Sequence, residues 1–189
     1  AWGMTELSPM GTLGALPAAL IDAPHEEQIA FKLKQGRPLA GIDLKLVDEA
    51  GERLPHDGRT PGRLMIKGPT IAREYFRLEG SPLDEEGFFD TGDIATLEPD
   101  GFMQITDRAK DVIKSGGEWI SSVDVENIAM GHPEADICAV IGIPDPKWEE
   151  RPLLLVKKAA GSALTGDAIL SFLEGKIARW WMPDRVEFI

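Results

Sequence analysis

A change of pattern near Asp107 constrains the fold of this chain more than any other feature of its sequence. Before it, short apolar stretches such as Ile42–Leu46 and Leu64–Ile66 alternate with polar residues and are separated by turns. After it, helical spacing and longer apolar runs take over. A chain of 189 residues is long enough to bury a core in each part. The sequence therefore predicts two differently built units.

The first unit, residues 1–106, is expected to consist mainly of short strands. Residues 1–36 hold many Gly and Pro turn signals and little periodicity, so we expect them to form a loop along a larger body. In residues 37–106 the alternating stretches are separated by turns such as Asp48–Gly51. This pattern predicts a small β-barrel or sandwich.

The second unit, residues 107–189, combines helices with strands. We expect a hairpin at Val112–Ile120. Ser121 and Asp124 then resemble a capping box, which begins a helix that Gly131–Pro133 brings to an end. The start of this unit therefore alternates between strand and helix, unlike the unit before it.

Two apolar runs follow this helix, Ile137–Ile143 and Leu153–Val156, and predict buried strands on either side of Pro144–Pro146. A second helix is expected to begin near Thr165. Its apolar face would contain Ile169, Leu173, Ile177 and Trp180. The predicted fold class is α+β, with a β-barrel subdomain followed by a small α+β domain.

Charge and cysteine content narrow the classes of partner. The net charge of −12 opposes binding to nucleic acid and to anionic membranes, so neither is an expected partner. The single cysteine, Cys138, excludes an intramolecular disulfide and lies in an apolar run, so we expect a small core residue. The lack of disulfides fits a cytoplasmic protein. No apolar run approaches the roughly 20 residues that a transmembrane helix needs.

The stretch Asp107–Ser121 is the strongest candidate for a binding site. It places three cations beside two adjacent glycines, which let a ligand approach the backbone closely. Positive side chains and bare N–H groups suit a ligand that carries phosphate. The residues concerned are Arg108, Lys110, Lys114, Gly116 and Gly117. The alternative is a polar hairpin with solvated lysines and surface ion pairs.

Two further motifs carry oxygen ligands. Thr5 could bond a phosphate oxygen and Glu6 could hold Mg²⁺, although the same residues also suit a helix cap. Asp93 follows the flexible turn Thr91–Gly92, and its carboxylate could accept bonds from the two hydroxyls of a ribose. The alternative for Asp93 is an ordinary turn residue. Each motif is weak alone, but their order along the chain is informative.

The aromatic and histidine residues add little by themselves. Trp2, Trp148 and Trp180 could each stack on a purine, and packing is the alternative for each of them. The three histidines have no metal-ligand spacing, and no Ser–His–Asp pattern is visible. Neither a zinc site nor a serine hydrolase is therefore indicated.

The order of these motifs closely resembles the adenylate-forming enzymes, which include acyl- and aryl-CoA synthetases, beetle luciferases and the adenylation domains of peptide synthetases. Ala1–Glu6 (AWGMTE) resembles the aromatic-Gly-x-Thr-Glu motif of the family, and Thr91–Asp93 its ribose-binding motif. Asp107–Gly117 resembles its hinge motif. The segments KDVIKSGGEWIS, PDPKW and WWMPD look most like the sequences of the medium- and long-chain fatty-acid–CoA ligases. The resemblance covers essentially the whole chain.

This resemblance implies roles for individual residues. Trp2, within the loop that includes Gly3, would stack on adenine, Thr5 would bond the AMP phosphate and Glu6 would hold Mg²⁺. Asp93 and Arg108 would bind the ribose. Lys110 would be the hinge residue, and Lys114 would face the active site during thioester formation. The remaining assignments are Gly116 and Gly117 along the pantetheine path, Trp148 and Trp180 for the adenine of CoA, and Met10 and Gly11 in the acyl pocket.

The implied activity is an AMP-forming acid–thiol ligase. A fatty acid would react with ATP to give an acyl-adenylate and pyrophosphate, and CoA would then take the acyl group and release AMP. Mg²⁺ is the implied metal, and a homodimer is a candidate assembly. Two alternatives stay open: another adenylate-former, such as an aryl- or thia-acid–CoA ligase or an enzyme that loads a carrier protein, and a non-catalytic interaction module.

Two parts of the family pattern are not found between residues 1 and 189. One is the Ser/Thr/Gly-rich phosphate loop with its lysine, and the other is the adenylation lysine expected about ten residues after Ile189. The resemblance thus implies that residues 1–106 are the end of a large AMP-binding domain and that residues 107–189 are a truncated mobile domain. We expect the isolated 1–189 chain to be unable to activate a fatty acid.

Overall fold

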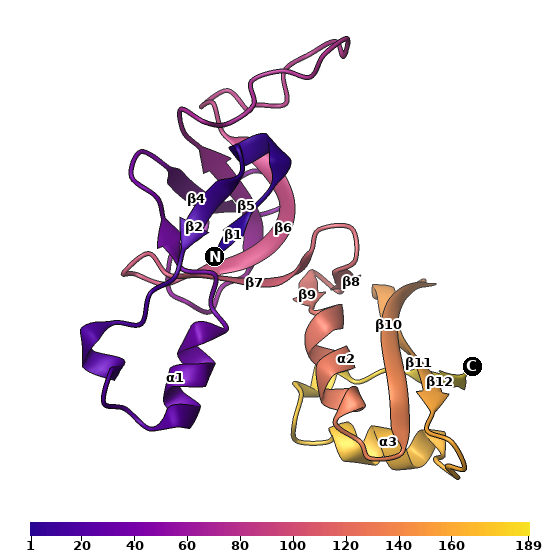
Figure 1. Cartoon of the computed structure of the whole chain (residues 1–189). Helices are drawn as coiled ribbons and strands as arrows, with labels where there is room; N and C mark the ends of the chain where they lie inside the picture. The colour runs from indigo at the N-terminus through magenta and orange to yellow at the C-terminus, as the bar shows by residue number, and fades with distance from the viewer. The chain divides into compact units, whose positions relative to one another are not determined.

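The computed structural model describes all residues from Ala1 to Ile189 and shows a mixed α+β fold with three sheets (Figure 1). The chain divides into two compact units, Ala1–Thr106 and Asp107–Ile189. Each cluster of buried apolar residues lies within one unit. The α+β prediction is therefore confirmed, and each unit is described separately below.

The centre of the first unit is a four-stranded sheet. Its strands follow the chain order: β4 (Asp43–Val47), β5 (Gly62–Lys67), β6 (Phe89–Leu97) and β7 (Met103–Arg108). The alternation seen in the sequence places Leu46, Leu64, Ala95, Leu97 and Met103 in one apolar cluster. One face of the sheet is therefore packed, as the period-two pattern predicted.

The expected barrel does not close. A barrel requires the first and last strands to pair, with a strand tilt and stagger that bring them together. Here β4 and β7 lie at opposite edges of the sheet, and four strands leave it open. Strands β4 and β5 lie where the sequence placed them, β6 and β7 were not located individually, and the closure was predicted wrongly.

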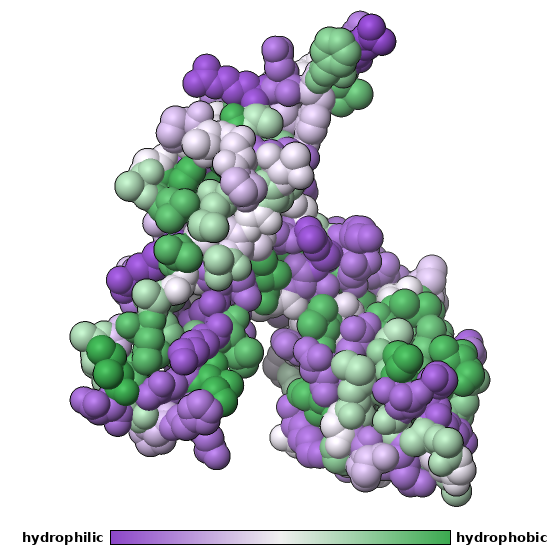
Figure 2. All heavy atoms as spheres, viewed as in Figure 1, coloured by the Kyte–Doolittle hydropathy of each residue, from purple (hydrophilic) through white to green (hydrophobic).

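The prediction of a loop over residues 1–36 was also wrong. This segment contains β1 (Trp2–Gly3), β2 (Met10–Leu13) and the helix α1 (His25–Lys32), and β3 (Arg37–Pro38) follows it. The strands form a second sheet in the order β1-β2-β3. Strands of two to four residues are too short to show a period. The helix α1 buries no residue, and Figure 2 shows apolar side chains at the surface around it.

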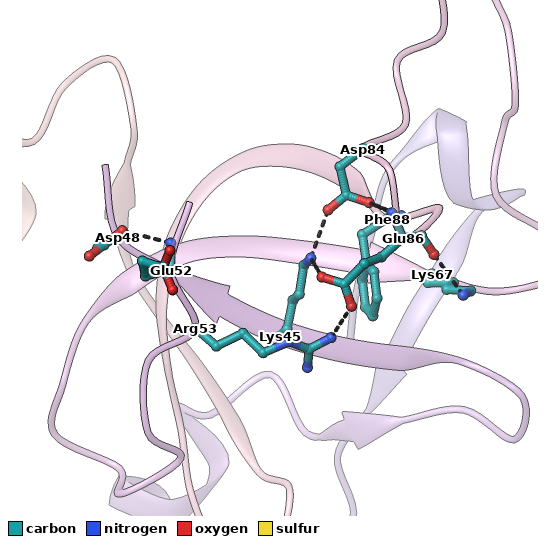
Figure 3. A network of polar contacts seen from close by, with 8 residues as sticks. All are labelled: Lys45, Asp48, Glu52, Arg53, Lys67, Asp84, Glu86 and Phe88. Atoms are coloured by element: carbon teal, nitrogen blue, oxygen red, sulfur yellow. Dashed lines mark hydrogen bonds and ion pairs between the residues drawn. The ribbon is translucent and has the colours of Figure 1, made fainter. Parts of the chain in front are cut away.

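The second face of the four-stranded sheet carries a charged network around Lys45 (Figure 3). Lys45 is 4% exposed, and its ammonium group donates hydrogen bonds of 2.7 Å to both Asp84 and Glu86. Its Nζ lies 4.3 Å from the ring centre of Phe88, and Arg53 also pairs with Glu86. Burial alone would lower the pKa of Lys45, but its bonds to the two carboxylates outweigh this effect and leave it raised. A buried cation is thus held by two acids and an aromatic ring.

The Lys45 network should contribute to the stability of the first unit. In the Lys45→Met variant the two carboxylates lose their cation, and we expect a loss of about 1 to 2 kcal/mol in the free energy of unfolding at pH 7. Urea unfolding measures this change. The matched control is Lys157→Met, because Lys157 pairs with Asp136 at the surface, and its loss should cost about 0.5 kcal/mol or less.

The same variant has a predictable pH dependence. Burial alone would raise the pKa of Asp84, but hydrogen bonds from Lys45 and from backbone N–H groups hold this pKa below its ordinary value. Hydrogen bonds from Lys45 and Arg53 lower the pKa of Glu86. Their stabilisation is complete above the unfolded pKa of about 4 and is lost as the pH falls through the lowered folded pKa. The difference between wild type and Lys45→Met should therefore shrink below about pH 4. A constant difference down to pH 2 would contradict this assignment.

The second unit is built on a five-stranded sheet in which β12 also pairs with β11. Its path is β10-β11-β8-β9. The strands are β8 (Ile113–Ser115), β9 (Glu118–Ile120), β10 (Ala135–Asp145), β11 (Glu149–Lys158) and β12 (Arg185–Phe188). The predicted hairpin and both predicted strands are confirmed, but β10 is buried on one face only, because Ile137 and Ile141 are 52% and 45% exposed. The parallel pairing of β12 with β11 was missed, because the short run at residues 185–188 gives no signal on its own.

The predicted helices begin where expected. Helix α2 (Ser122–Met130) starts with Ser121, whose Oγ accepts a bond of 3.1 Å from the N–H of Asp124. Helix α3 (Gly166–Leu173) starts with Thr165, which caps Ala168 in the same way.

The extent of the second helix was overpredicted. Trp180 lies in a separate 3₁₀ turn, η3 (Arg179–Trp181), because the chain leaves the helix at Glu174 and turns at Gly175. Ile177 and Trp180 were therefore wrongly placed on the apolar helix face, although Ile177 still packs against the core of this unit.

The core of the second unit lies between its sheet and the helices. It contains Val125, Cys138, Leu154, Ile169 and Leu173, with others. Burial raises the pKa of the Cys138 thiol, as expected for a small residue packed in a core. No helix in the chain has both the length and the apolar character needed to cross a membrane.

Candidate nucleotide-binding and thiol-binding surfaces

In the first unit, the motif AWGMTE folds back on residues 10–12. Strand β1 pairs with β2, which places Trp2 opposite Thr12 and Gly3 opposite Met10. A side chain at Gly3 would put its Cβ 2.0 Å from the carbonyl oxygen of Pro9, so only glycine fits there. Gly11 meets the ring of Trp2 in the same way, because a Cβ at this position would lie 2.7 Å from Cζ3. The predicted acyl-pocket and adenine residues are therefore direct neighbours.

A hydrogen bond joins this motif to a second one far along the chain. The indole N–H of Trp2 donates to Oδ2 of Asp93 at 3.0 Å, across 91 positions of sequence. Asp93 is 3% exposed, so the bond replaces contacts with water that its carboxylate has lost. Two of the motifs singled out in the sequence thus meet in one place.

The position of Asp93 depends on a bulge in β6. Met65 of β5 pairs with Asp90 and Arg63 pairs with Ile94, so β6 holds two extra residues at this point. Gly92 takes a φ of +72°, and the hydroxyl of Thr91 donates to the carbonyl of Leu64 at 2.9 Å in place of a backbone bond. The sequence Thr-Gly-Asp therefore interrupts the regular pairing of β6 with β5, while the hydroxyl of Thr91 keeps the two strands bonded.

Glu6 is held by a segment that the sequence did not point to. Its carbonyl accepts a bond of 2.8 Å from the N–H of Ala72, and its carboxylate accepts one of 3.0 Å from the hydroxyl of Tyr75. Tyr75 is the only tyrosine of the chain. Its being the single tyrosine was the one feature of the sequence that singled it out, and this feature does not reveal that Tyr75 bonds to Glu6, 69 residues away. Thr5 lies beside Glu6 in the 3₁₀ turn η1 (Thr5–Leu7).

The surroundings of Glu6 fit one mode of Mg²⁺ binding. The chain holds no cluster of three or more His, Cys, Asp or Glu side chains that could enclose a metal. Mg²⁺ commonly takes one or two carboxylates and completes its shell with water and substrate phosphates. A single fixed carboxylate such as Glu6 is therefore suited to Mg²⁺ that arrives with a nucleotide.

In the second unit, Arg108 and Lys110 line a hollow of about 410 Å³. Asp107 is 3% exposed and accepts a bond of 2.6 Å from the N–H of Ser122, so it anchors the start of α2. The side chain of Lys110 is 81% exposed. Two of the three predicted cations of this stretch therefore lie together, beside a buried carboxylate.

The hairpin β8–β9 carries the remaining candidates. Its turn is Gly116–Gly117, with φ values of +61° and +83°. Gly116 donates a bond of 2.8 Å to the carbonyl of Trp148, and the backbone N–H of Lys114 donates to Glu150 at 2.9 Å. Trp148 is 44% exposed and Trp180 is 57% exposed. The structure therefore brings Lys114, the two glycines and Trp148 together at the surface.

The two glycines of this turn should respond differently to substitution. Both have positive φ, which costs an alanine about 1 kcal/mol. At Gly116 the new Cβ would also lie 2.7 Å from the ring of Trp148, whereas at Gly117 it would meet nothing within 4 Å. We expect Gly116→Ala to lower the free energy of unfolding by about 2 to 3 kcal/mol and to alter the near-ultraviolet circular dichroism. Gly117→Ala should cost about 1 kcal/mol; equal effects would contradict the close packing of Trp148.

Models of two protein families match the chain. The AMP-binding enzyme model matches residues 1–76, and the model of the AMP-binding enzyme C-terminal domain matches residues 124–189. The two matches fall in different units of the structure.

Individual relatives agree with these matches. The chain is 52% identical to 3-methylmercaptopropionyl-CoA ligase of Ruegeria lacuscaerulensis and 47% identical to medium-chain-fatty-acid–CoA ligase of Ectopseudomonas oleovorans. Both alignments cover 100% of the chain and 35% of the relative, so the chain spans about a third of their length.

A solved structure shows the same fold. The crystal structure of ATP-bound MatB from Rhodopseudomonas palustris matches with a TM-score of 0.79 and 27% identity, over 99% of this chain and 35% of that one. The chain therefore belongs to the AMP-binding, or adenylate-forming, enzyme superfamily and corresponds to its C-terminal portion.

Proposed function

We propose that this chain is the C-terminal portion of an AMP-forming acyl-CoA ligase. The observation that carries the proposal is the bond from Trp2 to Asp93, which joins the two motifs of the first unit that resemble nucleotide-binding motifs. The names of the relatives, two acid–CoA ligases, support the same activity.

In this proposal the first unit holds the adenosine and phosphate of the nucleotide. Trp2 offers an aromatic face to adenine, and its indole N–H orients the carboxylate of Asp93 for the ribose hydroxyls. Thr5 donates to the α-phosphate.

Glu6 would hold Mg²⁺ in the same site. When bound, the metal neutralises charge on the phosphates as pyrophosphate leaves. The chain's own part is to hold the Glu6 carboxylate in place through Tyr75 and Ala72. Because one carboxylate alone binds Mg²⁺ weakly, the contacts that orient Glu6 determine the affinity for the metal.

The second unit would serve the thioester-forming step. Gly116 and Gly117 offer bare backbone to the pantetheine arm of CoA, and Trp148 and Trp180 offer exposed rings to its adenine. Lys114 lies in the strand that leads to these glycines. Lys110, which is exposed near the boundary between the units, is the proposed hinge residue.

The chemistry has two steps. The carboxylate of the acid attacks the α-phosphorus of ATP, a P–O bond forms, and pyrophosphate leaves with the electrons of the bond that breaks. The thiol of CoA then releases its proton to solvent, the thiolate forms a C–S bond with the acyl carbon, and AMP leaves with the electrons of the acyl C–O bond that breaks. Both steps depend mainly on positioning and on neutralising phosphate charge.

The acid is proposed to be an aliphatic carboxylate of short to medium length. Two relatives act, by name, on 3-methylmercaptopropionate and on medium-chain fatty acids, whose tails are unbranched and apolar. Met10, which is 40% exposed, would touch such a tail, and Gly11 would line the pocket through its backbone, since the ring of Trp2 packs directly against it.

ATP–pyrophosphate exchange by the natural polypeptide that contains residues 1–189 tests the activity. The acids to compare are the series from acetate to palmitate, 3-methylmercaptopropionate and benzoate. We expect exchange with one aliphatic group and little with benzoate. Exchange with no acid, from a sample that is folded by circular dichroism, would contradict the proposed function.

Asp93→Asn tests the proposed ribose ligand. The amide keeps the shape but loses the charge, and we expect the KM for ATP to rise about 10- to 100-fold. The matched control is Asp100→Asn, because Asp100 is paired with Arg37 at the surface, and its KM should stay within about 2-fold. An unchanged KM in Asp93→Asn would remove Asp93 from the site.

Tyr75→Phe tests the hydrogen bond that orients the carboxylate of Glu6. It removes only the hydroxyl, and we expect the Mg²⁺ concentration for half-maximal exchange to rise about 3- to 10-fold. Mn²⁺ binding followed by electron paramagnetic resonance, in the presence of ATP, should weaken in parallel. Phe76→Leu is the control, because Phe76 is 88% exposed. A lower rate without a change in metal dependence would contradict this role.

A further inference from the structure

Arg151 is the most highly connected side chain of the second unit. It stands near the start of β11, and its side chain is only 14% exposed. Its Nε and Nη2 donate to the two carboxylate oxygens of Asp184 at 2.9 and 2.8 Å. Its Nη1 donates at 3.0 Å to the hydroxyl of Ser115 and at 3.0 Å to the carbonyl of Trp180. Nη2 also donates to the carbonyl of Met182 at 3.1 Å, so every guanidinium nitrogen is used.

These bonds join segments that are far apart in sequence. Ser115 ends β8, directly before Gly116 and Gly117. Trp180 lies in η3, and Asp184 comes directly before β12. Between β8 and β11 the ladder consists of one pair of residues, Glu149 with Ser115. The guanidinium of Arg151 therefore supplements a short strand pairing.

The segments that Arg151 joins carry the exposed groups of this surface. Trp148 and Trp180 are both exposed, and Gly117 has open space around it. Gly116 donates to the carbonyl of Trp148, and the Trp148 ring lies against Gly116. One half-buried side chain thus fixes the spacing between the glycine turn and the backbone that carries Trp180.

The ion pair with Asp184 is only one part of this arrangement. Asp184 is 53% exposed, so the ion pair by itself would contribute about 1 kcal/mol or less. The three neutral acceptors require a planar fork with several fixed donors, which arginine has and lysine lacks. The role of Arg151 is therefore to fix the positions of these acceptors rather than to provide a charge.

We propose that Arg151 is a positioning residue for the thioester-forming step, which it serves by holding the Ser115–Gly117 backbone and the Trp180 segment in one fixed surface. This inference rests on the proposed function for its link to the thiol substrate. Arg151 does not touch the reacting atoms. It acts through the backbone on which the pantetheine arm would lie.

The experiment compares Arg151→Lys with Arg185→Lys in the natural polypeptide that contains residues 1–189. Arg185 is 60% exposed and pairs only with Glu187, so it is a matched control of the same chemical change. Exchange of ATP with pyrophosphate reports the first step, and thioester formation at varied CoA reports the second. For Arg151→Lys we expect exchange within about 2-fold of wild type and a 10- to 100-fold higher KM for CoA, with a smaller change in kcat.

A second readout needs no activity. Hydrogen exchange at the amides of Gly116 and Gly117, and iodide quenching of tryptophan fluorescence, should both increase in Arg151→Lys and not in Arg185→Lys. Asp184→Asn, which leaves the bonds to Ser115 and Trp180 in place, should show an intermediate effect.

The outcomes separate the two hypotheses. Equal losses in both half-reactions with a lower melting temperature would mean a structural role, and an unchanged KM for CoA would also overturn the proposal. If the wild type forms no thioester and no adenylate, the proposed function fails. The amide exchange and quenching then decide alone whether Arg151 holds this surface, and unchanged values there would overturn that part too.

Discussion

The bond between the indole of Trp2 and the carboxylate of Asp93 is the interaction on which the arrangement of the first unit depends. It connects the small β1-β2-β3 sheet to the bulge of the four-stranded sheet, and a hydrogen bond to a buried charge contributes more than one between neutral groups. The bulge with Gly92 turns Asp93 toward the indole, and the close approach of Gly3 and Gly11 lets β1 lie on β2. Glycines therefore determine where the side chains of Trp2 and Asp93 meet.

The two units differ in how far their fold could be predicted from the sequence. In the second unit, capping at Ser121 and Thr165 and the apolar run at Ile137–Ile143 are local signals, and they placed the hairpin, the helix starts and the strands correctly. In the first unit, strands of two residues carry no period, and whether a sheet closes depends on pairing between distant edges. Local patterns therefore predicted elements, but neither the closure of the sheet nor the fold of residues 1–36.

The candidate site shows the same division. Trp2, Glu6, Asp93 and the glycine turn stood out because motifs are contiguous in sequence. Tyr75 and Arg151 did not, because their importance lies in partners that are 69 and 33 residues away. A residue that orients another residue has no motif of its own. Only the register of β11 against β8 and β12 reveals that Arg151 stands among its acceptors.

The confinement of each apolar cluster to one unit has an evolutionary consequence. A substitution that repacks the core around Cys138 and Leu154 changes none of the side chains that pack beneath β4 and β5. Selection can therefore alter the surface around Trp148 and Trp180 without disturbing the framework that holds Trp2 and Asp93. Such modularity would allow one framework around Trp2 and Asp93 to be inherited together with many different surfaces on the second unit.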